Sequence, residues 1–348
     1  MRVPAEKLTA LVAGIFQKLG LTAEDAKICA DALVQADLSG VDTHGVSYYI
    51  ELLYVPGIQT GKINPRPRIQ TIHETPVTAL LDGDGGMGFV VGTRAMEIAI
   101  QKAKESGVGL VTVKNSSHYG MGGYYPLMAL AHDMIGLSMT SADRFVLPTF
   151  GRVPRVGTNP ISVAVPTAEE PPFLLDMATS TVPMGKIMLA RHEGAKLPQG
   201  WAADEEGRST TDPEVAWDAK HLLPLGGTYE QGSHKGYGLS VLVEILSAIL
   251  SGVQIRTDPE LGAEAGHFFG AIRIDAFRPV GEFESMMDGY LRMLRNTPPV
   301  EGQERVYYAG LIEYETRQER IRHGIPLHDR VVTYLQKLAN ELGVEQQI

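Results

Sequence analysis

The chain has 348 residues, of which 44% are hydrophobic and 21% charged, a composition ordinary for a globular protein with a sizeable core. Its formal net charge of −10 argues against nucleic acid or an anionic membrane as a partner, because both attract basic surfaces. The one cysteine, Cys29, has no partner for an internal disulfide, and the most apolar stretch, Leu239–Leu250, is too short to span a bilayer, so we expect a cytoplasmic protein.

Helices are expected over residues 5–54. Apolar residues recur at helical spacing over 8–19, and a glycine follows as a stop signal. Thr22 and Asp25 resemble a capping box that begins a second apolar stripe. Residues 56–76 contain four prolines and two glycines, so this segment is predicted to be a connector with at most edge strands.

Beyond the connector, strand and helix patterns alternate, which predicts an α/β protein. The predicted strands are 77–82, 108–114, 135–140, 161–165, 173–176 and 267–274. The predicted helices are 93–106, 236–251, 278–296 and a C-terminal helical segment that starts at Thr316. We expect a helical domain formed by 1–75 with 286–348, and an α/β domain spanning 76–285 that binds cofactor and substrate.

A glycine pattern in the first strand-to-helix turn resembles a dinucleotide-binding fingerprint. Gly83, Gly85 and Gly88 spell G-x-G-x-x-G between a predicted strand and a predicted helix. A Rossmann unit continues to a strand that ends in an acidic residue for the ribose, whereas the next strand here ends in Lys114 and Asn115. We therefore interpret the glycines as a turn that feeds a helix.

Four polar segments interrupt apolar runs at the ends of predicted elements, where functional sites usually lie. They are Asp42-Thr43-His44-Gly45, residues 115–120, Gly157-Thr158-Asn159-Pro160 and residues 232–238. Each has an ordinary structural explanation when taken alone: a capping histidine, a turn, or a polar helix cap that also suits an anion. The histidine spacing predicts no metal site, and the G-x-S-x-G elbow of serine hydrolases is missing from the sequence.

Taken together and in order, segments along nearly the whole chain resemble the type-2 malate/L-lactate dehydrogenases, a family that also contains diketogulonate reductase, ureidoglycolate dehydrogenase, sulfolactate dehydrogenase and a cyclic-imine carboxylate reductase. The matching segments are GVDTHGV (40–46), VKNSSHYGMGGYY (113–125), GTNPISVAVPT (157–167), LLDMATSTVPMGKI (174–187), PQGWAADEEGRSTTDP (198–213), GSHKGYGLSVLVEILSAILSG (232–252) and EYETRQERIRHGIPL (313–327). The resemblance implies a non-Rossmann NAD-binding fold with a helical part and a mixed-sheet α/β part. It also implies a homodimer with active sites near the subunit interface.

The resemblance further implies hydride transfer between a nicotinamide and a small 2-hydroxy or 2-keto acid. His44 is then the group that donates or accepts the proton, a step that histidine can perform near neutral pH. Thr43 stands where the family usually has serine and would orient His44, while His118 and Asn115 would line the pocket and polarise the substrate.

Cofactor contacts are implied for a longer set of residues, with NAD as the expected cofactor and NADP left open. The set comprises Asp176, Met177, Ala178, Thr179, Ser180, Thr181, Val182, His234, Lys235, Ala309, Gly310 and Leu311, with Thr140 and Asn159 near the nicotinamide. Asp176 ends a predicted strand, where a carboxylate can accept hydrogen bonds from a ribose diol, and Lys235 can meet the pyrophosphate as a point charge.

Two positions depart from the family pattern. Tyr48 replaces an arginine that usually pairs with the substrate carboxylate, and Ala309-Gly310-Leu311 replaces a Pro-Gly-Glu turn. We hypothesise that Arg144 supplies the missing positive charge. Two alternatives stay open: reduction of a cyclic imine carboxylate, and a family member that binds nucleotide without turnover.

Overall fold

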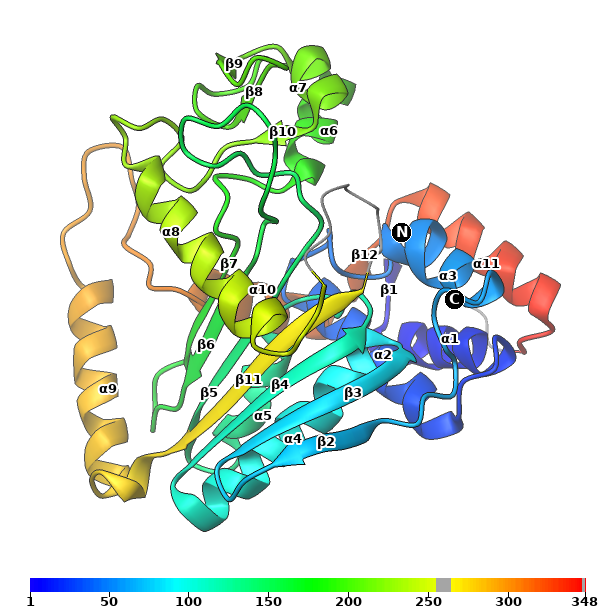
Figure 1. The fold of residues 1–348 in the computed structure, drawn as a ribbon, viewed down its shortest axis with the longest axis vertical. Coiled ribbons are helices and arrows are strands. Elements are labelled where there is room, and N and C mark those ends of the chain that lie inside the picture. The colour runs from blue at the N-terminus through cyan, green and yellow to red at the C-terminus, as the bar shows by residue number, and fades with distance from the viewer. Residues whose placement is uncertain (255–263, 346–347) are drawn as a thin grey trace.

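Among the described residues, 1–254, 264–345 and 348, seven strands form one mixed sheet at the centre of this computed structural model (Figure 1). The strands are β2 (Gln70–Glu74), β3 (Thr78–Gly86), β4 (Val108–Ser116), β5 (Met134–Thr140), β6 (Ile161–Val165), β7 (Phe173–Met177) and β11 (Ala265–Arg273). Their order is β2-β3-β4-β11-β5-β6-β7, with β3 and β4 parallel and the other neighbours antiparallel. The predicted α/β class is confirmed, and β2 is the edge strand expected in the connector.

Helices cover both faces of this sheet (Figure 1). On one face lie α4 (Gly88–Ser106) and α5 (Tyr124–Leu130), which pack on side chains such as Val111 and Phe269. On the other lie α8 (Ser233–Glu244) and the π-helical turn η2 (Ile245–Ile249), near the neighbouring residues Leu110 and Phe268. Successive residues of a strand point to opposite faces, and β4 and β11, which lie between these helices, are largely buried on both sides.

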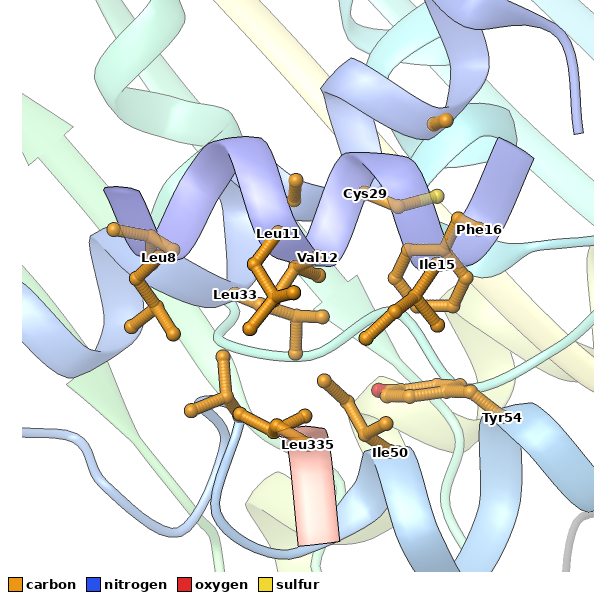
Figure 2. Close-up of a cluster of buried hydrophobic side chains, with 14 of the residues drawn as sticks. Leu8, Leu11, Val12, Ile15, Phe16, Cys29, Leu33, Ile50, Tyr54 and Leu335 are labelled. Atoms are coloured by element: carbon orange, nitrogen blue, oxygen red, sulfur yellow. The ribbon is translucent and has the colours of Figure 1, made fainter. Parts of the chain in front are cut away.

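A helical layer joins the two ends of the chain beside the sheet. Its helices are α1 (Ala5–Lys18), α2 (Ala23–Leu38) and α11 (Asp329–Leu342), and the short strands β1 (Arg2–Val3) and β12 (Ile325–Pro326) pair next to them. Figure 2 shows Leu11 and Ile15 of α1 facing Leu335, with Cys29 buried nearby. Thr22 accepts a hydrogen bond from the Asp25 N–H, as the capping pattern predicts. The domain boundaries at 75 and 286 stay a prediction.

A small unit above the sheet was not expected from the sequence (Figure 1). It contains α6 (Met184–Glu193), α7 (Pro213–Ala219), β8 (Ala202–Ala203), β9 (Ser209–Thr210) and β10 (His221–Leu222). Strands of two residues are too short to show alternation, and the helices are short. Such elements leave little periodic signal.

Other boundaries also differ from the predictions. The helices predicted over 5–54 include α1 and α2, but the chain leaves the helical conformation after α2 and returns to it at η1 (Ile50–Tyr54). The next helix, α3 (Val55–Gln59), begins inside the predicted connector. Pro56 is tolerated there because it lies in the first turn, where no helical N–H partner is lost. The C-terminal helices α9 (Val280–Arg295) and α10 (Leu311–His323) are followed by α11, and α10 starts five residues before the predicted Thr316. No helix in the described part of the chain is long and apolar enough to cross a membrane.

The glycines of the G-x-G-x-x-G pattern serve close packing. A Cβ atom added at Gly88 would lie 2.3 Å from the carbonyl oxygen of Ser117 and 2.4 Å from that of His118. Gly83 is similarly close to the carbonyl oxygen of Asn115, at 2.7 Å. Gly83 therefore lets β3 approach β4, and Gly88 lets α4 approach the backbone that follows β4. Gly83 and Gly85 lie within β3, so the turn that feeds α4 begins later than the sequence interpretation placed it.

Substituting Gly88 with alanine should therefore lower the free energy of unfolding by about 1–3 kcal/mol, because the backbone around His118 must move. Chemical denaturation measures this loss. The matched control is Gly289→Ala, an exposed glycine within α9 with no atom within 4 Å of its added Cβ. That change should stabilise the helix by about 0.5–1 kcal/mol, and equal losses in both variants would contradict the packing argument.

Candidate functional site

His44 lies on the loop between α2 and η1, folded back onto the end of α2. The Val41 N–H donates to the carbonyl oxygen of Ala36 and the His44 N–H to that of Val41, both at 2.9 Å. The Thr43 hydroxyl oxygen lies 2.9 Å from Nδ1 of His44. Burial lowers the pKa of His44 to about 4, so the imidazole is neutral at physiological pH.

His118 follows β4 and is held by two hydrogen bonds to one ring nitrogen. Its Nδ1 lies 2.7 Å from the Tyr54 hydroxyl and accepts the Gly120 N–H at 3.3 Å. A backbone N–H can only donate, so Nδ1 is the acceptor and the neutral ring carries its proton on Nε2. Burial lowers the pKa of His118 to about 3, with further lowering from His44 and His267.

The structure brings these two histidines together. Their ring centroids are 5.8 Å apart, and the planes lie within 18° of parallel. Tyr49 packs against both rings, with its centroid 4.4 Å from that of His118. A pair of neutral imidazoles in a largely desolvated site can supply one hydrogen-bond donor and one proton acceptor to the same small molecule.

Sequence reasoning missed Tyr49, Tyr54 and His267. Tyr54 belongs to the core shown in Figure 2, and only its hydroxyl group reaches the site. In the sequence, Tyr49 and Tyr54 read as part of an apolar helical stretch. The one available signal was the density of tyrosines that follows His44, since a buried tyrosine hydroxyl usually needs a partner.

A buried histidine supports the segment beneath His118. His267 has Nδ1 2.8 Å from the Thr140 hydroxyl and Nε2 2.8 Å from the Ser116 hydroxyl. Its ring stacks on Tyr119 with centroids 4.8 Å apart. Thr140, expected near the nicotinamide, is therefore engaged with His267 in the interior, and its cofactor role stays a prediction.

Because His267 is buried, we expect the folded protein to lose stability in acid. The pKa of His267 is lowered by desolvation from 6.5 to about 3, so the folded state binds fewer protons than the unfolded state between these values. The free energy of unfolding should fall as the pH drops through that window, by about 2 kcal/mol from this residue between pH 7.5 and pH 5. Denaturation curves at the two pH values measure the loss. A His267→Gln variant should be less stable at neutral pH but lose less on acidification; an unchanged slope would contradict the assignment.

The predicted substrate residues lie in different surroundings. Asn115 donates from its side-chain amide to Asp82 at 2.8 Å. The Tyr48 hydroxyl points to the sulfur of Met188 on α6, at 3.8 Å. Arg144 is half-buried and lies within electrostatic range of Glu244. Their roles toward a substrate stay predictions.

Predicted cofactor residues near the C-terminus contact β7 directly. The Leu174 N–H donates to the carbonyl oxygen of Ala309 at 3.1 Å. A Cβ atom added at Gly310 would lie 2.8 Å from Leu174, and Gly310 has a φ of 93°. Both the close approach and the backbone conformation therefore require glycine at this position. The turn 309–311 therefore adjoins the strand that ends near Asp176.

The segment after β7 connects in turn to the start of α8. The Thr181 N–H donates to the carbonyl oxygen of Leu223, and the Leu225 N–H to that of Thr179, both at 2.9 Å. A Cβ atom at Gly236 would lie 2.4 Å from the carbonyl oxygen of Leu225. Three segments that are distant in sequence, 176–182, 232–236 and 309–311, are thus connected through Leu174 and residues 223–225, and we call them the band.

Several members of this band already use their polar side chains within the protein. The Thr179 hydroxyl donates to the carbonyl oxygen of Thr158 at 3.0 Å, and the Ser180 hydroxyl to that of Val182 at 2.9 Å. Asn159, which is fully buried, donates to Glu244 and accepts the Ala142 N–H, both at 2.9 Å. These residues shape the band, and backbone groups and exposed side chains are left for a ligand.

Three charged or polar members remain accessible. Asp176 accepts hydrogen bonds from the Ser162 hydroxyl at 2.6 Å and the Gly123 N–H at 2.8 Å, yet it keeps an exposed edge. His234 and Lys235 are exposed in the first turn of α8, where no side chain caps the helix. The positive end of the helix dipole and the charge of Lys235 favour an anion at this end of α8.

A cavity of about 420 Å³ opens beside the 309–311 turn, within the range of small-molecule pockets. Residues lining it include Asp31, Met121, Tyr124, Leu174, Gly310 and Arg317. Met121 lies three residues after His118, so one chain segment links the cavity to the histidine pair. The cavity shares Leu174 and Gly310 with the contacts between β7 and the 309–311 turn.

Known proteins resemble this chain over nearly its whole length. The family model described as malate/L-lactate dehydrogenase matches residues 3–336. A malate dehydrogenase from Pyrococcus horikoshii is 45% identical, with 99% of this chain and 96% of that protein covered. An L-sulfolactate dehydrogenase from Methanocaldococcus jannaschii is 38% identical, with 96% and 95% covered. The crystal structure of malate dehydrogenase from Entamoeba histolytica superposes with a TM-score of 0.92 at 36% identity, covering 99% of this chain and 98% of that one. The chain therefore belongs to the malate/L-lactate dehydrogenase family.

Proposed function

We propose that the protein is a nicotinamide-dependent dehydrogenase of small 2-hydroxy acids. The observation that carries this proposal is the pair of neutral histidines, His44 and His118, 5.8 Å apart in a member of this family. His118 has a fixed N–H donor, and His44 has a ring nitrogen that is able to accept a proton. This is the complement that an alcohol needs as it becomes a ketone.

The two rings have distinct roles in this proposal. In the tautomer that donates from Nδ1 of His44 to Thr43, Nε2 is the proton acceptor. It takes the proton of the substrate hydroxyl as the C–H bond gives up a hydride. The Nε2–H of His118 donates to the same substrate oxygen and stabilises its developing negative charge. A bound nicotinamide supplies the hydride acceptor, and solvent removes the proton from His44.

The band over 176–182, 232–236 and 309–311 is the proposed cofactor site. Asp176 would accept hydrogen bonds from a ribose diol, and Lys235 would meet the pyrophosphate. Glu313 lies within electrostatic range of Asp176. The 2′-phosphate that NADP carries would be repelled by the carboxylates of Asp176 and Glu313, so we propose NAD over NADP. Titration of both oxidised cofactors by protein fluorescence tests this preference.

The relatives named for malate and L-sulfolactate support a substrate with a second anionic group. Arg144 is the proposed partner for it, in place of the arginine that Tyr48 replaces. The Arg144→Ala variant should have a raised KM for such a substrate. The matched control, Arg152→Ala, removes an exposed cation from the same connecting segment and should leave KM unchanged.

Reduction of a cyclic imine carboxylate is a second candidate, favoured by Tyr48. A tyrosine at this position offers no positive charge to a second carboxylate of the substrate. It therefore suits a substrate that has only one carboxylate. Steady-state assays that follow reduced nicotinamide absorbance test both candidates with 2-keto acids, the matching 2-hydroxy acids and cyclic imine carboxylates. Turnover of 2-hydroxy acids supports the first candidate. Turnover of imines alone would replace it, and binding of NAD without any turnover would leave a nucleotide-binding protein.

We also propose that a second copy of this chain covers the apolar surface of α8 and η2. Leu242, Ile245, Ile249 and Leu250 are all exposed there. The Ile249→Asp variant should shift the protein from dimer to monomer in sedimentation velocity runs, since a desolvated charge opposes a close apolar contact. The matched control is Ile72→Asp on the edge strand β2; Ile72 is 49% exposed against 55% for Ile249. A monomeric unmodified protein would contradict the proposed dimer.

A further inference from the structure

A carboxyl group lies buried beneath the loop that carries His44. Asp37, in the last turn of α2, has no exposed surface. Its Oδ2 accepts the N–H of Val46 at 2.9 Å, two residues beyond His44. Its carbonyl oxygen accepts the Gly40 N–H at 3.2 Å. One residue therefore contacts the loop on both sides of the histidine.

The second carboxyl oxygen faces Gly45. Among the described residues, Oδ1 of Asp37 has no hydrogen-bond partner, although it is buried. A Cβ atom added at Gly45 would lie only 1.9 Å from it. Gly45 has no positive φ, so the requirement for glycine comes from this close approach to Asp37 rather than from backbone conformation.

A guanidinium group ties down the outer end of the same loop. Arg320 of α10 donates to the carbonyl oxygen of Asp37 and to the carboxylate of Asp42. The loop between Asp42 and Val46 is thus anchored at its start by Arg320 and at its end by Asp37. His44 lies midway between the two anchors.

Burying the Asp37 carboxyl group lowers the stability of the fold, and the helix α2 does not need a carboxyl group at this position. An unpartnered buried carboxyl oxygen lowers stability, whereas an apolar side chain at this position of the helix would not. Desolvation raises the pKa of Asp37 to about 8, so the group is largely uncharged at neutral pH. The hydrogen bond from the Val46 N–H works against this shift but does not outweigh the desolvation.

We propose that Asp37 is a positioning residue that fixes the His44 ring through the Val46 N–H and through close contact with Gly45. This inference rests on the proposed function, in which His44 exchanges the substrate proton. Because the contact needs only a side-chain oxygen acceptor for the Val46 N–H, asparagine should replace Asp37 in this role and leucine should not. A misplacement of a catalytic group by about 1 Å costs about 10²-fold in rate.

The test compares Asp37→Asn with Asp37→Leu in the full-length protein. We expect Asp37→Leu to lower kcat by about 10²-fold with little change in the KM for NAD, and Asp37→Asn to keep kcat within a few-fold. NMR titration of His44 gives a readout independent of turnover: its pKa should rise toward the ordinary 6.5 in Asp37→Leu, as water reaches the loosened loop, and stay low in Asp37→Asn. The matched control is Asp288→Leu, another buried aspartate that accepts backbone N–H groups, from Glu169 and Glu170, far from the site. It should lower thermal stability while kcat stays unchanged.

Clear outcomes would overturn the proposal. A folded Asp37→Leu variant with unchanged kcat and an unchanged His44 pKa would do so, as would an Asp37→Asn variant impaired as strongly as Asp37→Leu. If Asp37→Leu does not fold, Gly45→Ala pushes the loop off the carboxyl group and should give the same loss of kcat and the same rise in pKa. If the unmodified enzyme turns over no hydroxy acid, the proposed function fails, and the NMR titration still decides whether Asp37 holds His44 in place.

Discussion

Replacing His44 with alanine should lower kcat for 2-hydroxy acid oxidation by about 10²–10⁴-fold, the usual contribution of a positioned general base. The substrate hydroxyl must lose its proton as the carbon loses hydride, and Nε2 of His44 is the proposed acceptor. The affinity for NAD should change little, because the proposed cofactor band lies on other segments. Steady-state kinetics and fluorescence titration of NAD measure the two effects separately.

The control for this change is His192→Ala, which removes an exposed histidine from α6. Its kcat should equal that of the unmodified protein. Thr43→Val keeps His44 but removes the hydroxyl 2.9 Å from Nδ1, so it should show an intermediate loss through a less favoured tautomer. A His44→Ala variant that retains full kcat would remove the central residue of the proposed mechanism.

The sheet and the long helices were largely predictable because each carries a repeated signal. Residues 108–113 are mostly apolar and rich in valine, and β4 packs on both faces. The small unit with α6 and α7 was not predicted, because its strands are two residues long and the shapes of its loops depend on tertiary contacts. A local pattern needs several turns of helix or alternations of strand before it stands out from chance.

The candidate site was predictable as a set of segments but not as a set of contacts. His44 and His118 were singled out from motifs 74 residues apart, and the structure brings them together. Asp37, Tyr54 and His267 escaped notice because a buried polar residue within an apolar stripe shows its role only through the partner it meets. Conversely, Asn159 and Thr140 were expected near the nicotinamide, and the structure engages their side chains in the interior.

Replacing His118 with alanine should lower kcat/KM by about 10²–10³-fold, the usual cost of losing one donor to a developing oxyanion. The Nδ1 of this ring accepts from Gly120 and Tyr54, so its only donor is Nε2–H. A His118→Gln variant keeps an N–H donor at a similar reach and should recover part of the loss. Tyr54→Phe should cost less, because the Gly120 N–H still selects the tautomer.

The pH dependence of the two alanine variants decides which ring exchanges the proton. If His44 is the acceptor, kcat/KM in His118→Ala still falls on acidification, as the neutral His44 becomes protonated, and His44→Ala loses this acid limb. The reverse pattern would exchange the two roles and make His118 the base. For His118 to accept a proton at Nδ1, it would have to give up the hydrogen bond from the Gly120 N–H. For it to accept one at Nε2, it would have to change to the tautomer that the contacts of Gly120 and Tyr54 with Nδ1 disfavour. The hydrogen bonds to Nδ1 of His118 thus make the first pattern the expected one.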